Sequence, residues 1–176
     1  MQELVADGIL QEDKIIVESK EAIDEFYHGV WYGELEGKKL RLDLIEACLL
    51  MERGRLKVSD NGKELKINDL IEMASDLDQR FIPRYAVYKD LRERGLPVRM
   101  GFKGSDFRVY ERGAKPGKSE TVKWVVFIDY EDYSCEMDKL GKAIEMCENI
   151  RAEALWGIAD DDGDVTYYII KTMKEL

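Results

Sequence analysis

The sequence predicts a two-subdomain protein of the mixed α/β (α+β) class. Its 176 residues, 45% hydrophobic and 36% charged, are enough for two small folded cores and are atypical of a disordered chain. Short β-branched and aromatic runs alternate with helical patterns along the whole length. A break near residues 78–83 separates a small N-terminal α/β subdomain, residues 1–79, from a C-terminal α/β subdomain with a central mixed sheet, residues 80–176.

The N-terminal subdomain is expected to begin with a strand and a capped helix. The apolar run KIIV predicts a strand at residues 14–17. Ser19 is a favourable N-cap for a helix that runs to about His28. We expect another strand at residues 30–35, followed by a turn at Gly37.

A second helix and a hairpin complete this subdomain. Asp43 and Glu46 form a capping-box pattern, and Gly54 marks the end of the helix that follows. The pair Asn61-Gly62 predicts a tight hairpin turn. A further helix is expected from Asn68 through Leu77.

The C-terminal subdomain is expected to contain two helices and five strands. Pro83 suits the first turn of a helix and Gly95 follows its end, while Ser134 is the expected cap of the second helix. The expected elements are a helix at 83–94, strands at 98–101, 107–111 and 122–130, a helix at 136–150, and strands at 154–159 and 165–170.

Composition excludes several classes of protein. The N-terminal segment is acidic and lacks a signal-peptide design, and no apolar stretch reaches about 18 residues, so we expect a cytoplasmic protein with no membrane partner. Cys48, Cys135 and Cys147 are widely spaced, and with His28 as the single histidine they form no zinc pattern. We interpret the cysteines as buried thiols and expect neither a metal nor a cofactor.

Charge is distributed unevenly along the chain. The formal net charge is −10, yet residues 80–118 contain 11 lysines or arginines and 4 acidic residues. An acidic chain is not expected to bind RNA non-specifically, because phosphate contacts need clustered cations. The basic stretch either lines one face of an RNA site or solvates a helix face, and the sequence leaves both interpretations open.

An acidic turn precedes the last strand. Asp160, Asp161, Asp162 and Asp164 surround Gly163 between two apolar segments. An EF-hand is excluded, because the glycine comes one position early, no glutamate closes the loop and strands flank it. Mutual repulsion gives the monomer no stability from these charges, so they indicate either a solvated turn or a knob that docks on a basic partner surface.

The last strand is apolar on both of its faces. Val165, Tyr167 and Ile169 alternate with Thr166, Tyr168 and Ile170. This pattern predicts a strand that is buried on two sides.

Three segments resemble the archaeal tRNA-splicing endonucleases in sequence and order. They are YGELEGKKLRLDLIEACLLMERGRL at residues 32–56, YAVYKDLRERGLPVRMGFKGSDFRVY at 85–110 and DDDGDVTYY at 160–168. The resemblance implies an endonuclease-like N-terminal subdomain and a nuclease-like C-terminal one. It also implies action on precursor tRNA at a bulge-helix-bulge, without metal, through attack of a ribose 2′-hydroxyl that leaves a 2′,3′-cyclic phosphate.

The family's catalytic set is incomplete in this chain. The family uses a tyrosine as base, a histidine as acid and a lysine to stabilise the phosphorane. Tyr110 matches the tyrosine, but Glu120 or Thr121 occupies the histidine position and Ala152 the lysine position. Loss of a general acid alone typically costs about 100- to 10,000-fold in rate, so we interpret Tyr110 as an inactive remnant. Candidate RNA contacts are the cations Lys103, Arg108, Arg112 and Arg151.

The resemblance implies that this chain is a structural subunit. In the family, the acidic loop enters a basic pocket on a partner and the last strands pair across a two-fold-like interface. The corresponding assembly residues are Asp160, Asp161, Asp162, Asp164, Val165, Tyr167 and Ile169. We expect a heterotetramer with two copies of a catalytic endonuclease subunit, holding precursor tRNA. Two alternatives stay open: an active subunit that uses Lys118 or Lys123, and a stand-alone RNA-binding module.

Overall fold

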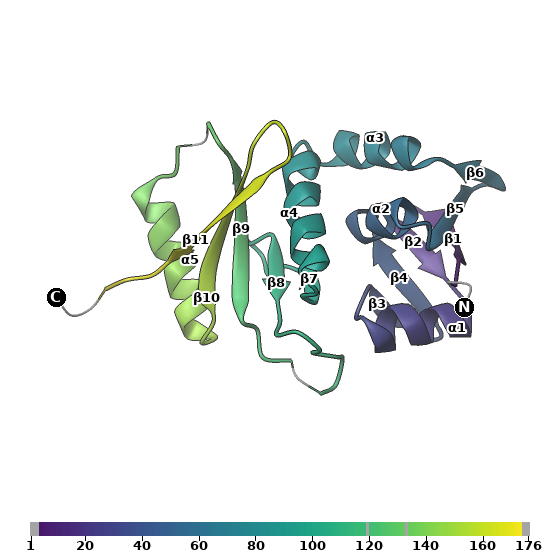
Figure 1. Ribbon diagram of the computed structural model, residues 1–176, viewed down its shortest axis with the longest axis horizontal. Helices are drawn as coiled ribbons and strands as arrows, with labels where there is room; N and C mark the ends of the chain where they lie inside the picture. The colour runs from purple at the N-terminus through teal and green to yellow at the C-terminus, as the bar shows by residue number, and fades with distance from the viewer. Residues whose placement is uncertain (1–3, 119, 133, 174–176) are drawn as a thin grey trace. The chain divides into compact units, whose positions relative to one another are not determined.

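The chain divides into two compact units, Met1–Ile82 and Pro83–Leu176. The computed structural model describes residues 4–118, 120–132 and 134–173 (Figure 1). Each unit is built on its own mixed sheet, which confirms the predicted α/β class. Among the described residues, no helix is both long and apolar enough to cross a membrane.

The N-terminal unit is a six-stranded sheet in the order β3-β4-β2-β1-β5-β6. Strands β1 and β5 run parallel, and the other neighbours are antiparallel. The strands are β1 Ala6–Gln11, β2 Lys14–Val17, β3 Glu34–Glu36, β4 Lys39–Asp43, β5 Leu56–Asp60 and β6 Lys63–Leu65. The helices are α1 Lys20–Ile23, which continues as the π-helix η1 Asp24–Gly29, then α2 Leu44–Glu52 and α3 Ile67–Leu77.

The predicted capping box at the start of α2 is confirmed. The Asp43 side chain accepts from the Ile45 N–H, and Glu46 Oε2 accepts from the Asp43 N–H at 2.9 Å. Glu46 is buried, and its other carboxylate oxygen accepts from the Gly33 N–H at 2.9 Å. One glutamate therefore fixes both the helix start and the turn before β3, which satisfies its buried charge.

One expectation for this unit is wrong, and two of its strands, β1 and β4, are not among the expected elements. The strand expected at residues 30–35 begins only at Glu34, because Trp31 (φ 59°) and Gly33 (φ 64°) take left-handed conformations that interrupt an extended run. A Cβ at Gly33 would lie 2.6 Å from the Arg41 carbonyl oxygen, so this close approach requires glycine. Strand β1 was not expected at all; it contains a glycine, which strands disfavour, and pairs with the distant β5.

The C-terminal unit is a five-stranded sheet in the order β11-β10-β9-β8-β7. Strands β9 and β10 are parallel, and the other neighbours are antiparallel. The strands are β7 Val98–Met100, β8 Phe107–Val109, β9 Trp124–Tyr130, β10 Glu153–Ala159 and β11 Val165–Ile170. The helices are α4 Phe81–Glu93 and α5 Met137–Asn149.

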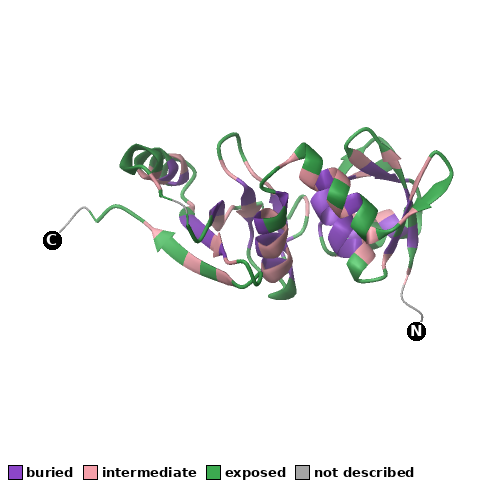
Figure 2. Cartoon of the chain, turned by 90° about the horizontal axis from the view of Figure 1, so that it is seen from above, coloured by how far each residue is buried: buried purple, intermediate pink, exposed green. Residues whose placement is uncertain are grey.

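The two helices cover opposite faces of this sheet (Figure 1). On one face, α4 lies against Phe107, whose ring is 5.4 Å from that of Tyr88, and against Gly157, where an added Cβ would lie 3.2 Å from Val87. On the other face, α5 closes a core that contains the stacked rings of Phe127 and Trp156. Both faces at the sheet centre are therefore buried, as Figure 2 shows in purple.

Two details of the C-terminal unit differ from expectation. Ser134 does not cap α5; the N-cap is Glu136, and it makes no side-chain capping bond. Strand β11 is not buried on both sides, because Tyr168 is 55% exposed and Ile169 50% exposed. The strand pairs only with β10 and forms the sheet edge, so its outward side chains stay accessible in the single chain.

Candidate functional site

Three segments meet at one edge of the C-terminal sheet. Because β8 runs antiparallel to β9 and β9 parallel to β10, the end of β8 lies beside the starts of β9 and β10. The Lys123 N–H donates to the Val109 carbonyl at 2.8 Å, and the Glu153 N–H donates to the Lys123 carbonyl at 3.0 Å. We call this the Tyr110 edge, because Tyr110 follows β8 there.

Tyr110 is enclosed by the protein. Only 3% of the residue is exposed, and its backbone N–H donates to the Pro97 carbonyl at 3.1 Å. A general base must come within hydrogen-bond distance of the proton that it takes. In this conformation Tyr110 as a whole residue offers little surface to a substrate.

The segment that precedes β9 contains no imidazole. Glu120 is exposed and its carboxylate accepts from the Gly117 N–H at 2.8 Å, which shapes the local turn. Thr121 is exposed as well. Lys123 forms an ion pair with Glu111 at 2.7 Å and lies 4.3 Å from the Trp124 ring centroid. Of the two lysines that flank Glu120 and Thr121 most closely, Lys118 and Lys123, Lys123 is therefore already ion-paired with a carboxylate.

The corner between α5 and β10 has an unusual backbone. Arg151 has φ 58°, its N–H donates to Glu148 O, and the Ala152 N–H donates to Cys147 O. This is a Schellman motif with arginine at the position that usually carries glycine. Arg151 is exposed, whereas Ala152 packs its methyl group against the core beneath α5.

The four candidate RNA contacts lie on different segments of the C-terminal unit. Arg112 and Arg151 are exposed on segments that adjoin the Tyr110 edge, while Lys103 is exposed in the turn between β7 and β8. Arg108 is half-buried; its Nε donates to the Met100 carbonyl at 2.8 Å, and its guanidinium lies 5.0 Å from the Phe102 ring centroid.

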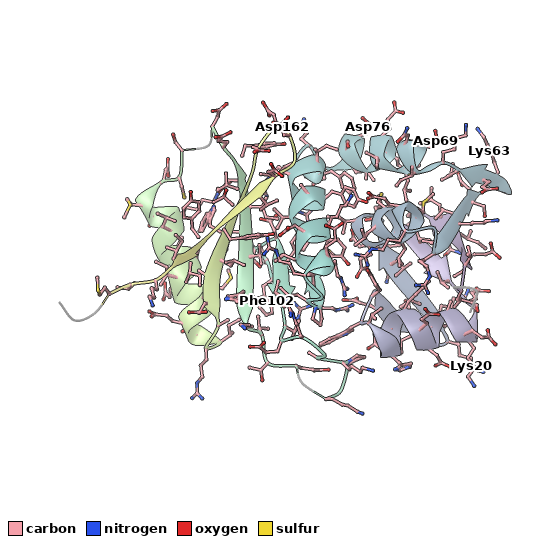
Figure 3. The ribbon with its side chains drawn as sticks, in the orientation of Figure 1. Lys20, Lys63, Asp69, Asp76, Phe102 and Asp162 are labelled. Carbon is pink, nitrogen blue, oxygen red and sulfur yellow. The ribbon has the colours of Figure 1, made fainter. Side chains whose placement is uncertain are left out.

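The acidic turn connects the end of β10 to the start of β11, so it lies at the opposite end of the strands from the Tyr110 edge. Asp160 Oδ1 accepts from the N–H groups of Asp162 and Asp164 at 3.0 and 2.9 Å, and so shapes the turn. The other aspartates, Asp161, Asp162 and Asp164, are exposed (Figure 3 labels Asp162). Within the described ranges, no group of three or more histidine, cysteine, aspartate or glutamate side chains could hold a metal ion.

A polar contact ties the last strand to α4. The Tyr167 hydroxyl donates to Asp90 Oδ2 at 2.7 Å, and Arg94 holds the same carboxylate through two N–H groups. Burial raises the pKa of Tyr167 above its ordinary value, and the bond to Asp90 adds to the effect. Tyr167 therefore anchors β11 from within the chain, whereas Ile169, two residues on, is half exposed.

Comparison with known proteins identifies both units. Residues 6–71 match the model of the tRNA intron endonuclease N-terminal domain. Residues 81–167 match the tRNA intron endonuclease catalytic C-terminal domain.

The chain belongs to the tRNA intron endonuclease family.

Relatives in this family align over most of the chain. A tRNA-splicing endonuclease of Thermococcus onnurineus is 37% identical over 166 residues, which cover 94% of this chain and 95% of the relative. One of Pyrococcus furiosus is 35% identical and covers 97% and 98%. One of Methanococcoides burtonii is 40% identical over 90% of this chain but only 44% of its own length. The chain therefore aligns both with relatives of its own size and with one about twice as long.

Proposed function

We propose that this chain is the structural, non-catalytic subunit of a heteromeric tRNA-splicing endonuclease of the cytoplasm, which removes introns from precursor tRNA at bulge-helix-bulge sites. Two copies join two copies of a catalytic chain. Residues 1–79 form the N-terminal endonuclease-like subdomain, and residues 80–176 form a catalytic-like subdomain with a degenerate site.

The state of the Tyr110 edge carries this proposal. Tyr110 is 3% exposed, the partly buried Ala152 packs against the core at the position where the family has a lysine, and the single histidine of the chain, His28, lies in the N-terminal unit. The family's histidine and lysine are therefore both missing from the Tyr110 edge, and the exposed Arg112 and Arg151 that adjoin it cannot protonate the leaving 5′-oxygen. The charge that develops on that oxygen is then not neutralised by proton transfer, so the proposal assigns cleavage to another chain.

Two surfaces at the far side of the sheet support an assembly role. Among the described residues, β11 pairs with β10 alone and so forms an edge strand, and its exposed Tyr168 and Ile169 suit pairing with a second strand. The exposed Asp161, Asp162 and Asp164 form an acidic knob that favours a basic pocket on the partner. With Asp160 and the residues Val165, Tyr167 and Ile169, these are the proposed assembly residues.

Reconstitution tests the proposal. The purified chain is incubated with intron-bearing precursor tRNA, alone and together with a catalytic relative that has the full tyrosine, histidine and lysine set. We expect no cleavage by the chain alone and cleavage by the mixture. Efficient cleavage by the chain alone would refute the proposal.

A charge variant tests the assembly surface. Asp161→Asn, Asp162→Asn and Asp164→Asn together remove the knob but leave Asp160, which shapes the turn. We expect weaker co-elution with the catalytic chain and roughly tenfold slower cleavage at limiting subunit, with unchanged thermal stability. The control variant Glu64→Gln, Glu72→Gln and Asp76→Asn removes the same number of exposed charges from the N-terminal unit and should assemble normally.

The first alternative is an active subunit with a divergent site. Lys118 is exposed, and Lys123 forms an ion pair with Glu111. Of these two lysines, Lys118 is therefore the one without an ion pair among the described residues. In that case Tyr110→Phe would abolish cleavage by the isolated chain. The second alternative, a stand-alone RNA-binding module, requires tight RNA binding without a protein partner, which the net charge of −10 disfavours.

A further inference from the structure

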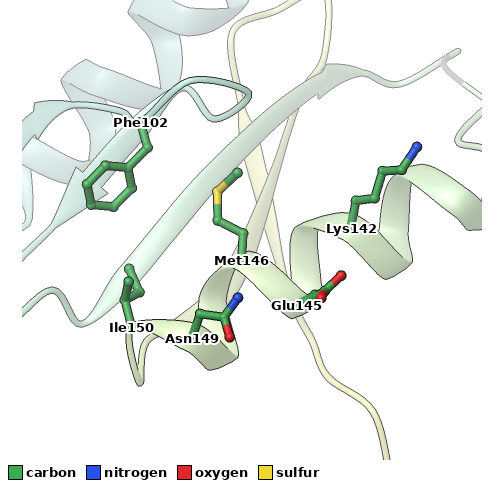
Figure 4. A pocket seen from close by; sticks show the side chains of 6 residues that line it. All are labelled: Phe102, Lys142, Glu145, Met146, Asn149 and Ile150. Atoms are coloured by element: carbon green, nitrogen blue, oxygen red, sulfur yellow. The ribbon is translucent and has the colours of Figure 1, made fainter.

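A shallow groove lies between the β7–β8 turn and helix α5 (Figure 4). Its volume is about 430 Å³, and it is lined by Phe102, Lys142, Glu145, Met146, Asn149 and Ile150. The helix residues recur at intervals of three and four, so they form one stripe on α5. The groove lies wholly within the C-terminal unit.

The walls of the groove suit a flat heteroaromatic ring. Phe102 is 38% exposed, and the Arg108 guanidinium, 5.0 Å from its centroid, covers the ring as a cation–π partner. Across the groove, Met146 and Ile150 present apolar surface, and Asn149 presents an amide that can both donate and accept hydrogen bonds (Figure 4). An aromatic platform beside one amide is the chemistry that holds an unpaired nucleobase by stacking and edge recognition.

Charge and position around the groove favour a nucleic-acid strand. Lys103 follows Phe102 directly and is exposed, and the exposed Arg151 follows Ile150. Glu145 is the acidic group of the lining, and Lys142 is ion-paired with Asp138 at 2.6 Å. A backbone phosphate is therefore favoured beside Lys103 and Arg151 and disfavoured beside Glu145.

The lining of the groove ends at Ile150, one residue before the corner between α5 and β10 that adjoins the Tyr110 edge. Ile150 is the C-cap of α5, and Arg151 and Ala152 follow it at the corner where the family places its lysine. A strand whose base occupies the groove would thus pass the edge that lacks the cleavage groups.

We propose that this groove holds one unpaired base of an RNA strand, stacked on Phe102 and hydrogen-bonded by Asn149. The inference rests on the proposed function, because it assigns RNA binding to a subunit whose degenerate site lacks the groups needed for cleavage. A protein side chain is the competing occupant.

A stacking-sensitive probe tests the groove. The full chain is titrated at low ionic strength with a short single-stranded oligoribonucleotide that carries a central 2-aminopurine, whose fluorescence is quenched on stacking. We expect quenching by the natural chain, and for Phe102→Ala loss of the quench with about tenfold weaker affinity. Phe102→Leu, which keeps apolar bulk without a ring, should also lose the quench.

Control variants separate stacking from a general defect. Tyr130→Ala removes an aromatic residue that is more exposed than Phe102 (46% against 38%) from the C-terminal end of β9, and it should bind like the natural chain. Circular dichroism verifies that each variant is folded. Equal binding and quenching by Phe102→Ala and the natural chain would overturn the inference, as would a loss that Tyr130→Ala shares.

The two proposals fail separately. If Phe102→Ala leaves RNA binding intact but weakens association with the catalytic chain, the groove binds protein and the base-binding inference is wrong, while the structural-subunit proposal stands. If the chain by itself cleaves precursor tRNA yet quenches the probe through Phe102, the structural-subunit proposal is wrong and the base-binding inference is upheld.

Discussion

Replacing Arg151 by glycine is expected to stabilise the fold and to weaken RNA binding. Arg151 has φ 58° at the C′ position of the Schellman motif that ends α5. For a residue with a Cβ, this left-handed conformation costs about 1–2 kcal/mol. Glycine adopts this conformation without that cost. Glycine also gives the unfolded chain more conformational freedom, which offsets about 0.5–1 kcal/mol of the stabilisation.

The net gain in the free energy of unfolding is therefore about 0.5–1 kcal/mol. For a chain of this length, that raises Tm by about 1–4 °C. Urea unfolding, followed by tryptophan fluorescence that includes Trp156 in the core beneath α5, measures the change. A higher midpoint at unchanged slope identifies a change in stability rather than in the unfolded state.

Arg151→Ala is the matched control for both effects. Alanine removes the guanidinium but keeps the Cβ, so it retains the backbone strain and should unfold within about 0.5 kcal/mol of the natural chain. Both variants should bind precursor tRNA more weakly in the assembled complex. If glycine and alanine are equally stable, the backbone argument is wrong; if both bind RNA like the natural chain, Arg151 is not an RNA contact.

Further predictions follow from the titrating groups of the core. Tyr167→Phe removes the bond to Asp90 and should lower the free energy of unfolding by about 1 kcal/mol near neutral pH. The pKa of Tyr167 in the folded state is raised above the ordinary 10.0, so the tyrosine of the unfolded state loses its proton first, and the free energy of unfolding falls as pH rises beyond about 10. Urea titrations across that range should show a shallower loss of stability in the Phe variant than in the natural chain. An identical loss in both would contradict the assignment. Burial raises the pKa of Cys48 to about 12 and of Cys147 to about 11, so a thiol reagent at about pH 8 should modify only Cys135 in the folded chain and all three thiols in urea. Rapid modification of native Cys48 would show that its core opens.

Local sequence signals correctly predicted several features that a few neighbouring residues decide. The capping box of Asp43 and Glu46 and the turn at Asn61-Gly62 appear as expected, because each depends on side chains or backbone angles within four residues. Strand β1 was missed, because the pairing that stabilises it joins Ala6 to Leu56. The strand expected at residues 30–35 begins only at Glu34, because local residue preferences do not indicate that Trp31 adopts a left-handed conformation.

The arrangement of the candidate site also depends on pairing between distant segments, which the sequence did not predict. That Tyr110, Thr121 and Ala152 converge at one edge depends on the parallel pairing of β9 with β10, which no local pattern reports. The groove beside Phe102 was not predicted either, since its two walls come from a short turn and a helix far apart in the chain. Its only signal in the sequence is an aromatic residue beside a lysine in a glycine-flanked turn.

The sequence by itself determined which chemical groups this family member possesses. A single imidazole, at His28, and alanine at the lysine position are covalent facts that no folding can change. The tertiary structure decided which groups are accessible and near one another: Tyr110 is enclosed, Arg151 is exposed on a strained corner, and the acidic turn lies at the opposite end of the strands. Burial and proximity arise from strand pairing and packing between distant residues, so they appear only when the whole chain is folded.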